Sequence, residues 1–156
     1  MNSNAAIKLV IDSRIENVFL VGIAVNRICS HLDLGDMGSG QVELCVVEAV
    51  TNSIKHSYSG TPGREVTLTV NLLTDRVEFQ ISDHGSSMPP GLLTNPTLEF
   101  DPQNLESLPQ SGMGLFLIHQ IMDEVHYVPG EGKNTLTLVK RIRGARQMSD
   151  CAMQAS

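Results

Sequence analysis

Residues 65–83 read EVTLTVNLLTDRVEFQISD and contain two runs in which apolar and polar residues alternate strictly. In the first run every second residue is Val or Leu, and in the second Val77, Phe79 and Ile81 repeat the pattern. Alternation with a period of two is typical of half-buried β-strands. Because only the short polar turn TDR separates the runs, this stretch predicts an antiparallel hairpin.

Helical and strand patterns surround the hairpin. Ser13 and Glu16 fit a capping box at the start of the first helix, and the apolar residues that follow recur with the helical period. This order of elements predicts an α+β fold: a two-layer α/β sandwich with a mixed, mainly antiparallel sheet and helices on one face. We expect strands at 6–12, 126–128 and 136–142, and helices at 14–31, 41–57 and 114–125.

Length and composition limit the protein class. The 156 residues predict one domain over residues 1–143, followed by a flexible tail over 144–156. Residues 84–111 hold five of the seven prolines and little periodicity, which is typical of a lid or binding loop. Eleven Lys and Arg against seventeen Asp and Glu argue against binding to a nucleic-acid backbone or an anionic membrane. Three cysteines without a CxxC pair, no signal peptide and no membrane-spanning run predict a cytoplasmic protein.

A polar stripe follows the second predicted helix. Glu48, Asn52 and His56 are spaced by four residues, so they lie within about 80° of one another around the helix axis. The apolar arc of the helix adjoins this stripe, which places the stripe at the margin of the core. A solvated helix face and the wall of a cleft both fit this pattern.

Asp83 continues the inward parity of the second strand. A carboxylate that points inward requires hydrogen-bond partners, because burying it unpaired costs several kcal/mol. Such a group suits recognition of an exocyclic amino group. The alternative is that the strand has ended and Asp83 caps a turn with Gly85, and the sequence leaves both readings open.

The segment Ser111-Gly112-Met113-Gly114-Leu115 precedes the third predicted helix. Glycines at a helix N-terminus let backbone amides approach an anion, but a flexible hinge fits the segment equally well. The segment is not a P-loop, because no GK[ST] follows. It is not a dinucleotide fingerprint, because a loop and not a strand precedes it.

Taken in order, these motifs carry a family resemblance. EAVTNSIKH (48–56), DHG (83–85) and GMGLFLIHQIMDEV (112–125) resemble the conserved boxes of the GHKL (Bergerat-type) ATP-binding superfamily. The last segment is similar to the bacterial anti-sigma factor serine/threonine kinases. The resemblance spans about residues 6–142.

The resemblance implies ATP and Mg²⁺ as cofactors and assigns residue roles. Asn52 would hold Mg²⁺, Asp83 would bind the adenine amino group, and Glu48 would be the catalytic general base. Asn134 stands where the family often has a threonine, and no Lys or Arg lies between Asp83 and Gly114. The remaining nucleotide-binding positions implied by the motifs are His56, Gly85, Gly112, Met113, Gly114 and Leu115.

The resemblance also implies a function and partners. It describes an anti-sigma factor with protein serine/threonine kinase activity that sequesters a sigma factor and phosphorylates an anti-anti-sigma partner of the STAS type. It further implies a homodimer formed through the first strand and its neighbouring helix. The alternative, favoured by Asn134 and by the absence of Lys and Arg from the lid, is a catalytically weak or inactive ATP- or ADP-binding adapter. A detached histidine kinase domain is disfavoured, because the segment before the second helix holds only His31.

Overall fold

A computed structural model describes residues 4–35, 38–89 and 113–143 of the chain. The expected tail (144–156) and most of the expected lid (90–111) lie outside the described residues. The elements follow in the order β1 (Ala5–Asp12), the 3₁₀ turn η1 (Ile15–Asn17), α1 (Val18–Cys29), α2 (Gly38–Asn52), the π-helix η2 (Ser53–Ser57), β2 (Glu65–Leu72), β3 (Arg76–Asp83), α3 (Met113–Ile121), β4 (Glu124–Val128) and β5 (Asn134–Arg141).

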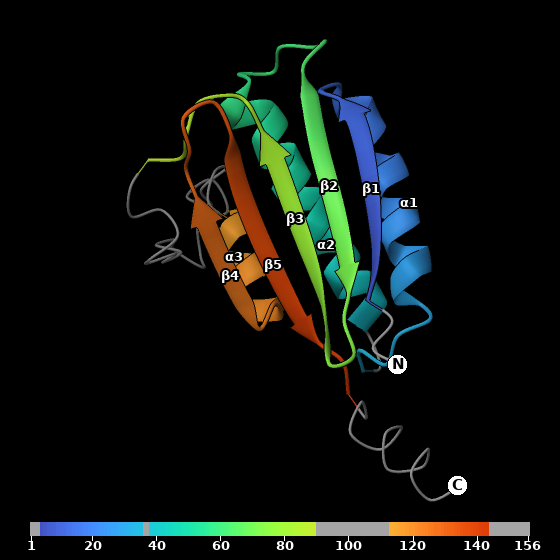
Figure 1. Ribbon diagram of the computed structural model, residues 1–156. Coiled ribbons are helices and arrows are strands. Elements are labelled where there is room, and N and C mark those ends of the chain that lie inside the picture. The colour runs from blue at the N-terminus through green and yellow to red at the C-terminus, as the bar shows by residue number, and fades with distance from the viewer. Residues whose placement is uncertain (1–3, 36–37, 90–112, 144–156) are drawn as a thin grey trace, which may run out of the picture.

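The strands form one sheet in the order β1-β2-β3-β5-β4. All four strand pairs are antiparallel, so the described sheet holds no parallel pair of the kind that a mixed sheet would include. Figure 1 shows α1, α2 and α3 together on one face, while the opposite face carries no described helix. The predicted α+β sandwich is therefore confirmed. The hairpin β2–β3 lies at the centre of the sheet, and β5 enters between β3 and β4.

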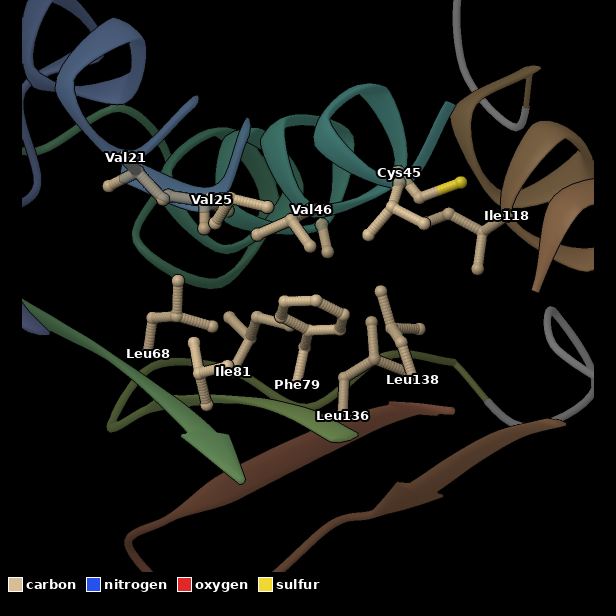
Figure 2. Packing of buried hydrophobic residues seen from close by; sticks show 14 of the residues in the cluster. Val21, Val25, Cys45, Val46, Leu68, Phe79, Ile81, Ile118, Leu136 and Leu138 are labelled. Atoms are coloured by element: carbon tan, nitrogen blue, oxygen red, sulfur yellow. The ribbon is translucent and has the colours of Figure 1, made fainter. Parts of the chain in front are cut away.

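The core fills the space between the helices and the sheet. Leu68, Phe79 and Ile81 point from the strands toward Val46 of α2 and Ile118 of α3 (Figure 2). The polar residues of the alternating strands lie on the open face, which explains the strict alternation in the sequence. Any internal cavity must therefore lie between the helices and this face of the sheet.

Two cysteines are part of this core. Cys29 ends α1 and Cys45 lies in α2, and both are buried. Burial raises the pKa of the Cys29 thiol to about 11 and that of the Cys45 thiol to about 12. Both thiols are therefore neutral packing groups at physiological pH.

Two local expectations were wrong. Ser13 does not cap a helix: its hydroxyl donates to the carbonyl of Thr61 and accepts from the amide of Arg64, so it ties β1 to the loop before β2. The third helix ends at Ile121 and does not continue to residue 125. Lys140 donates to the Ile121 carbonyl at 2.7 Å and satisfies the helix end, and Glu124 already begins β4.

No helix among the described residues combines the length and the apolar character that crossing a membrane requires.

Candidate functional site

A cavity of about 390 Å³ opens between the C-terminal half of α2, the ends of β3 and β5, and the start of α3. Its volume falls within the range typical of small-molecule sites. The apolar residues include Ile81, Leu115 and Leu136, and the polar residues come from α2, η2, β3, β4, β5 and the loop after β3. The lining is Ala49, Asn52, Ser53, His56, Ser57, Ile81, Asp83, Ser86, Ser87, Met88, Pro89, Leu115, Tyr127, Asn134 and Leu136.

The polar stripe of the second helix lines this cavity where the α-helix changes to a π-helix. Asn52 is the last residue of α2, and the chain continues as the π-helix η2, in which the amide of Tyr58 donates to the carbonyl of Ser53. Single π-turns occur often at functional sites. Asn52 and His56 both line the cavity, with His56 exposed at its margin. Of the two readings of the stripe, the wall of a cleft is therefore correct for these two residues.

Asp83 is 5% exposed and lines the same cavity. Its Oδ1 accepts from the backbone amide of Gly85 at 3.0 Å and from Nδ2 of Asn134 at 3.0 Å. The turn cap and the inward carboxylate are therefore both present in one residue. Because both hydrogen bonds within the described residues go to Oδ1, the second oxygen, Oδ2, remains available as an acceptor.

Gly85 lies directly against the π-turn. A Cβ at this position would fall 2.5 Å from the carbonyl carbon of Ser57 and closer still to its oxygen. The same Ser57 oxygen accepts a hydrogen bond from the amide of Ser86 at 2.9 Å. The glycine is needed here because the two backbones touch, and this contact joins η2 and the residues after β3 into one wall of the cavity.

The residues that follow Asp83 are fixed by side chains from two further places. The phenol oxygen of Tyr58 accepts from the amide of His84 at 2.7 Å and donates to the carbonyl of Glu65 at 2.6 Å. The phenol oxygen of Tyr127, on β4, accepts from the amide of Met88 at 2.8 Å. The first residues of the predicted lid, 84–88, are therefore held against the body of the fold.

Glu48 lies one turn before Asn52 and is directed toward the start of α3. A Cβ on Gly114 would fall 2.5 Å from Oε2 of Glu48. The carboxylate therefore packs against the first turn of α3, in the space that the missing side chain leaves. Glu48 is not part of the cavity lining but borders it through Gly114 and the adjoining Leu115.

Not every expected site residue is placed. Gly112 lies outside the described residues, and the backbone of Met113 begins α3. Asn52, His56, Asp83 and Leu115 line the cavity, and Gly85 and Gly114 make the close approaches that shape it. Their roles as nucleotide ligands stay predictions.

The sequence did not single out Tyr127, Ser57 or Met88 as lining residues, and it gave Ser87 no role. Tyr127 and Asn134 reach the cavity because β5 pairs with β3 and β4 pairs with β5, which brings Asn134 opposite Asp83 in register. The one available signal was Asn134, which stands where the family that the sequence resembles often has a threonine. Local patterns do not give this strand order.

The described lining of the cavity includes an acidic side chain and no basic one. Asp83 is the carboxylate in the lining, and no Lys or Arg occurs among the lining residues that the structure describes. No cluster of three or more His, Cys, Asp or Glu side chains suited to a metal ion occurs within residues 4–35, 38–89 and 113–143. An amide oxygen such as that of Asn52 can still contribute one ligand to a magnesium ion that takes its other ligands from phosphate and water.

Known proteins are similar to this chain in sequence and in fold. The model of the histidine kinase-like ATPase domain matches residues 11–140. A serine-protein kinase RsbW from Bacillus mycoides is 27% identical over 131 residues, which cover 83% of this chain and 81% of the relative. A serine-protein kinase RsbW from Listeria innocua is 30% identical over 130 residues, which cover 81% of each chain.

Two solved structures show the same arrangement of helices and strands. The RsbU and RsbW domains of a Mycobacterium tuberculosis protein align with a TM-score of 0.62 at 15% identity, over 88% of this chain and 32% of the larger one. The histidine kinase domain of a blue-light activated kinase from Erythrobacter litoralis aligns with a TM-score of 0.53 at 16% identity, over 88% of this chain and 64% of that one. At these identities the structures establish the fold alone.

Proposed function

Because the chain belongs to the histidine kinase-like ATPase family, we propose that it is an ATP-dependent protein serine/threonine kinase that acts as an anti-sigma factor. In this proposal it works in the cytoplasm, sequesters a sigma factor and phosphorylates an anti-anti-sigma protein of the STAS type. The observation that supports it most is the single cavity that joins Asn52 of α2 to Asp83 of β3.

The base of the nucleotide would lie at the Asp83 end. The side chains of Ile81, Leu115 and Leu136 provide an apolar surface against which a purine ring can pack. Oδ2 of Asp83 would accept a hydrogen bond from an exocyclic amino group. Hydrogen bonds to a charged partner contribute about 1.5–3 kcal/mol each. Recognition of adenine therefore needs no movement of the carboxylate, because Oδ1 is already held by Gly85.

The phosphates would extend toward Asn52 and the start of α3. Since no Lys or Arg lines the described cavity, neutralisation of the phosphate charge depends on the magnesium ion that Asn52 would help to hold. Mg²⁺, when bound, supplies charge neutralisation and alignment of the phosphates. The N-terminus of α3 adds the positive end of its helix dipole at the same end.

Glu48 is the proposed general base. Its carboxylate lies beside Gly114 at the first turn of α3, close to where the terminal phosphate would be received. From there it can accept the proton of an attacking Ser or Thr hydroxyl. Phosphorylation would add about −1.5 to −2 charge to the partner and weaken its docking on this acidic protein.

Binding is tested first by titrating ATP with and without Mg²⁺. Wild type should bind ATP more tightly with Mg²⁺, Asn52→Ala should lose this difference, and Asp83→Asn should lose affinity under both conditions. Thr51→Ala is the matched control, because Thr51 is the neighbour of Asn52 on α2 and is not part of the lining. Equal ATP affinity of Asp83→Asn and wild type would contradict the proposed position of the base.

Catalysis is tested by incubation with labelled ATP and a purified STAS-domain anti-anti-sigma protein. Glu48→Gln should lower the rate of phosphoryl transfer by about 100-fold or more while ATP binding persists. Glu124→Gln, at the exposed start of β4, should leave the rate unchanged. Transfer by Glu48→Gln at the wild-type rate would exclude Glu48 as the base.

A second candidate function is a nucleotide-binding adapter that holds its partner without phosphorylating it. The cavity lining without Lys or Arg favours this function, because cationic side chains normally stabilise phosphoryl transfer. ATP binding that depends on Asp83, together with no labelled partner protein, would identify the adapter.

We also propose a homodimer formed through the β1 edge of the sheet and α1. Six large apolar side chains on β1, η1 and α1 are exposed, Phe19 the most at 62%. Phe19→Glu should yield monomers in sedimentation equilibrium, whereas Leu44→Glu, on the exposed face of α2, should not. Unchanged association of Phe19→Glu would contradict this interface. The exposed residues are Ile7, Val10, Ile15, Phe19, Leu20 and Ile23.

A further inference from the structure

Residues 84–88 run from the end of β3 along one end of the sheet, past the start of β5, to β4 (Figure 1). Every second backbone amide of this segment donates a hydrogen bond to a neighbouring part of the fold. The donor–acceptor distances lie between 2.7 and 2.9 Å. The three pairs are His84 with the phenol oxygen of Tyr58, Ser86 with the carbonyl oxygen of Ser57, and Met88 with the phenol oxygen of Tyr127.

The acceptor for Met88 lies on a different wall of the cavity from the other two acceptors. Ser57 ends η2 and Tyr58 follows it directly, whereas Tyr127 belongs to β4, the edge strand beside β5. Tyr127 is itself half-buried and lines the cavity. The segment is thus attached at both of its ends, and Tyr127 supplies the attachment at the β4 end.

Met88 is the residue that this attachment holds in place. Its side chain is half-buried, packs against the core and lines the same cavity as Ile81, Leu115 and Leu136. Because a methionine side chain has three rotatable bonds, the position of its backbone decides which surface it can contact. Without an acceptor the Met88 amide would turn toward water, since backbone amides that are shielded from water need a partner. The apolar wall that Met88 provides would then move away from a ligand.

We propose that Tyr127 is a positioning residue for the bound nucleotide, which fixes Met88 as a wall of the cavity through the Met88 amide. The inference rests on the proposed binding of ATP, and it adds a residue that acts on affinity without touching a reacting group. When a site binds its ligand in one arrangement only, the apparent dissociation constant rises as the fraction of protein in that arrangement falls. Tyr127 therefore acts on ATP binding by keeping residues 84–88 in the arrangement that the ligand requires.

Tyr127→Phe removes this attachment and retains the aromatic ring. Because one neutral hydrogen bond is lost, the dissociation constant of ATP and its KM should both rise by about twofold to tenfold. The rate of phosphoryl transfer to a purified STAS-domain protein at saturating ATP should stay the same, because the proposed base, Glu48, lies on α2 beside Gly114 and not on β4. Val128→Thr is the matched control and should leave both constants unchanged, since Val128 is the next residue of β4 and is 64% exposed.

A double-mutant cycle tests whether Tyr127 acts through Met88. Calorimetric titration with ATP and Mg²⁺ compares wild type, Tyr127→Phe, Met88→Ala and the double variant, and thermal melting checks that each protein is folded. Met88→Ala removes the side chain that is positioned, so adding Tyr127→Phe to it should change the dissociation constant by less than about twofold. A direct contact between the phenol and ATP would instead keep its full effect in the Met88→Ala background.

Hydrogen exchange of the wild-type protein provides a second measurement that needs no variant. Because ATP binds the attached arrangement, it should make opening of the segment rarer. Exchange of the Met88 amide, followed by NMR, should therefore slow by at least about threefold at saturating ATP with Mg²⁺.

The outcomes separate this inference from the proposed function. Wild-type ATP affinity in Tyr127→Phe, a full effect of this change in the Met88→Ala background, or unchanged exchange of the Met88 amide would each overturn the role of Tyr127 while ATP binding stands. A lower transfer rate of folded Tyr127→Phe at saturating ATP would overturn it as well. Wild type that binds no ATP would contradict the proposed function and this inference with it.

Discussion

Gly85→Ala offers the sharpest test of the cavity wall. The backbone of Gly85 has no positive φ, so alanine is excluded by space and not by conformation. Its Cβ would fall 2.5 Å from the carbonyl carbon of Ser57, whereas carbon atoms in contact lie about 3.5 Å apart, so the two backbones must separate by about 1 Å. That shift also breaks the hydrogen bond from Ser86 to Ser57, now 2.9 Å long.

The cost follows from these two effects. Overpacking against backbone costs about 1–3 kcal/mol, and the lost hydrogen bond adds about 1 kcal/mol. For a domain of this length, the sum of about 2–4 kcal/mol should lower the melting temperature by roughly 4–16 °C. Calorimetry or circular dichroism measures the shift.

The control is Gly40→Ala in α2, where an added Cβ meets nothing within 4 Å. Its melting temperature should stay the same or rise slightly, because alanine favours helix. If Gly85→Ala melted within about 2 °C of wild type, the close contact between the π-turn and the residues after β3 would not exist, and the joined wall of the cavity would be wrong.

Three further predictions concern single side chains. Tyr58→Phe removes both hydrogen bonds of the buried phenol and should lower the free energy of unfolding by about 1–3 kcal/mol in urea titrations. Burial also raises the pKa of Tyr58. The stabilisation of the fold by the phenol is therefore complete below the unfolded pKa of about 10 and is lost as the pH rises through the folded pKa. A difference in unfolding free energy between wild type and Tyr58→Phe that grew above about pH 10 would contradict this. In Gly114→Ala the atom nearest the added Cβ is the movable carboxylate oxygen of Glu48, so the melting temperature should hold within about 2 °C while phosphoryl transfer falls as in Glu48→Gln. An unchanged rate would mean that the displaced carboxylate has no catalytic role. In a Cys151→Ser variant the two buried thiols should not react with a thiol reagent at pH 8 until guanidinium unfolds the chain, and rapid labelling of the native protein would place them outside the core.

The fold could be predicted where one physical rule decides an element. Residues 65–72 alternate because one sheet face packs on the helices and the other meets water, and β2 has these same bounds. Residues 122–125 follow a helical pattern as well as a strand pattern. Lys140, from β5, caps the helix at Ile121, and no local rule contains that contact.

The capping box failed for a related reason. Ser13 and Glu16 have the right spacing, but the Ser13 hydroxyl finds partners in the loop at residues 61–64, which β1 brings near by pairing with β2. A side chain with two possible sets of partners takes the set that the tertiary fold supplies, and a short motif describes only the local set.

In the candidate site, too, local patterns predicted some residues, whereas others depend on the tertiary fold. The parity of β3 was enough to predict that Asp83 points inward, because register fixes the face of every residue in a strand. Asn134 and Tyr127 come to the cavity only through the order β3-β5-β4. Asn134 could be noted as a departure from a family pattern, but its contact with Asp83 required the pairing of the two strand ends.

Asp83 shows why the sequence left two interpretations open. A turn cap and a ligand contact look like alternatives when a residue is counted as one group, but a carboxylate has two oxygens. Oδ1 carries the cap to Gly85 and the bond from Asn134, which fixes the orientation of the carboxylate, and Oδ2 is left for a ligand. Asp83→Ala would remove both functions and confuse folding with binding. Asp83→Asn keeps an oxygen for the cap and places a donor where the ligand requires an acceptor, so it separates the structural oxygen from the recognition oxygen.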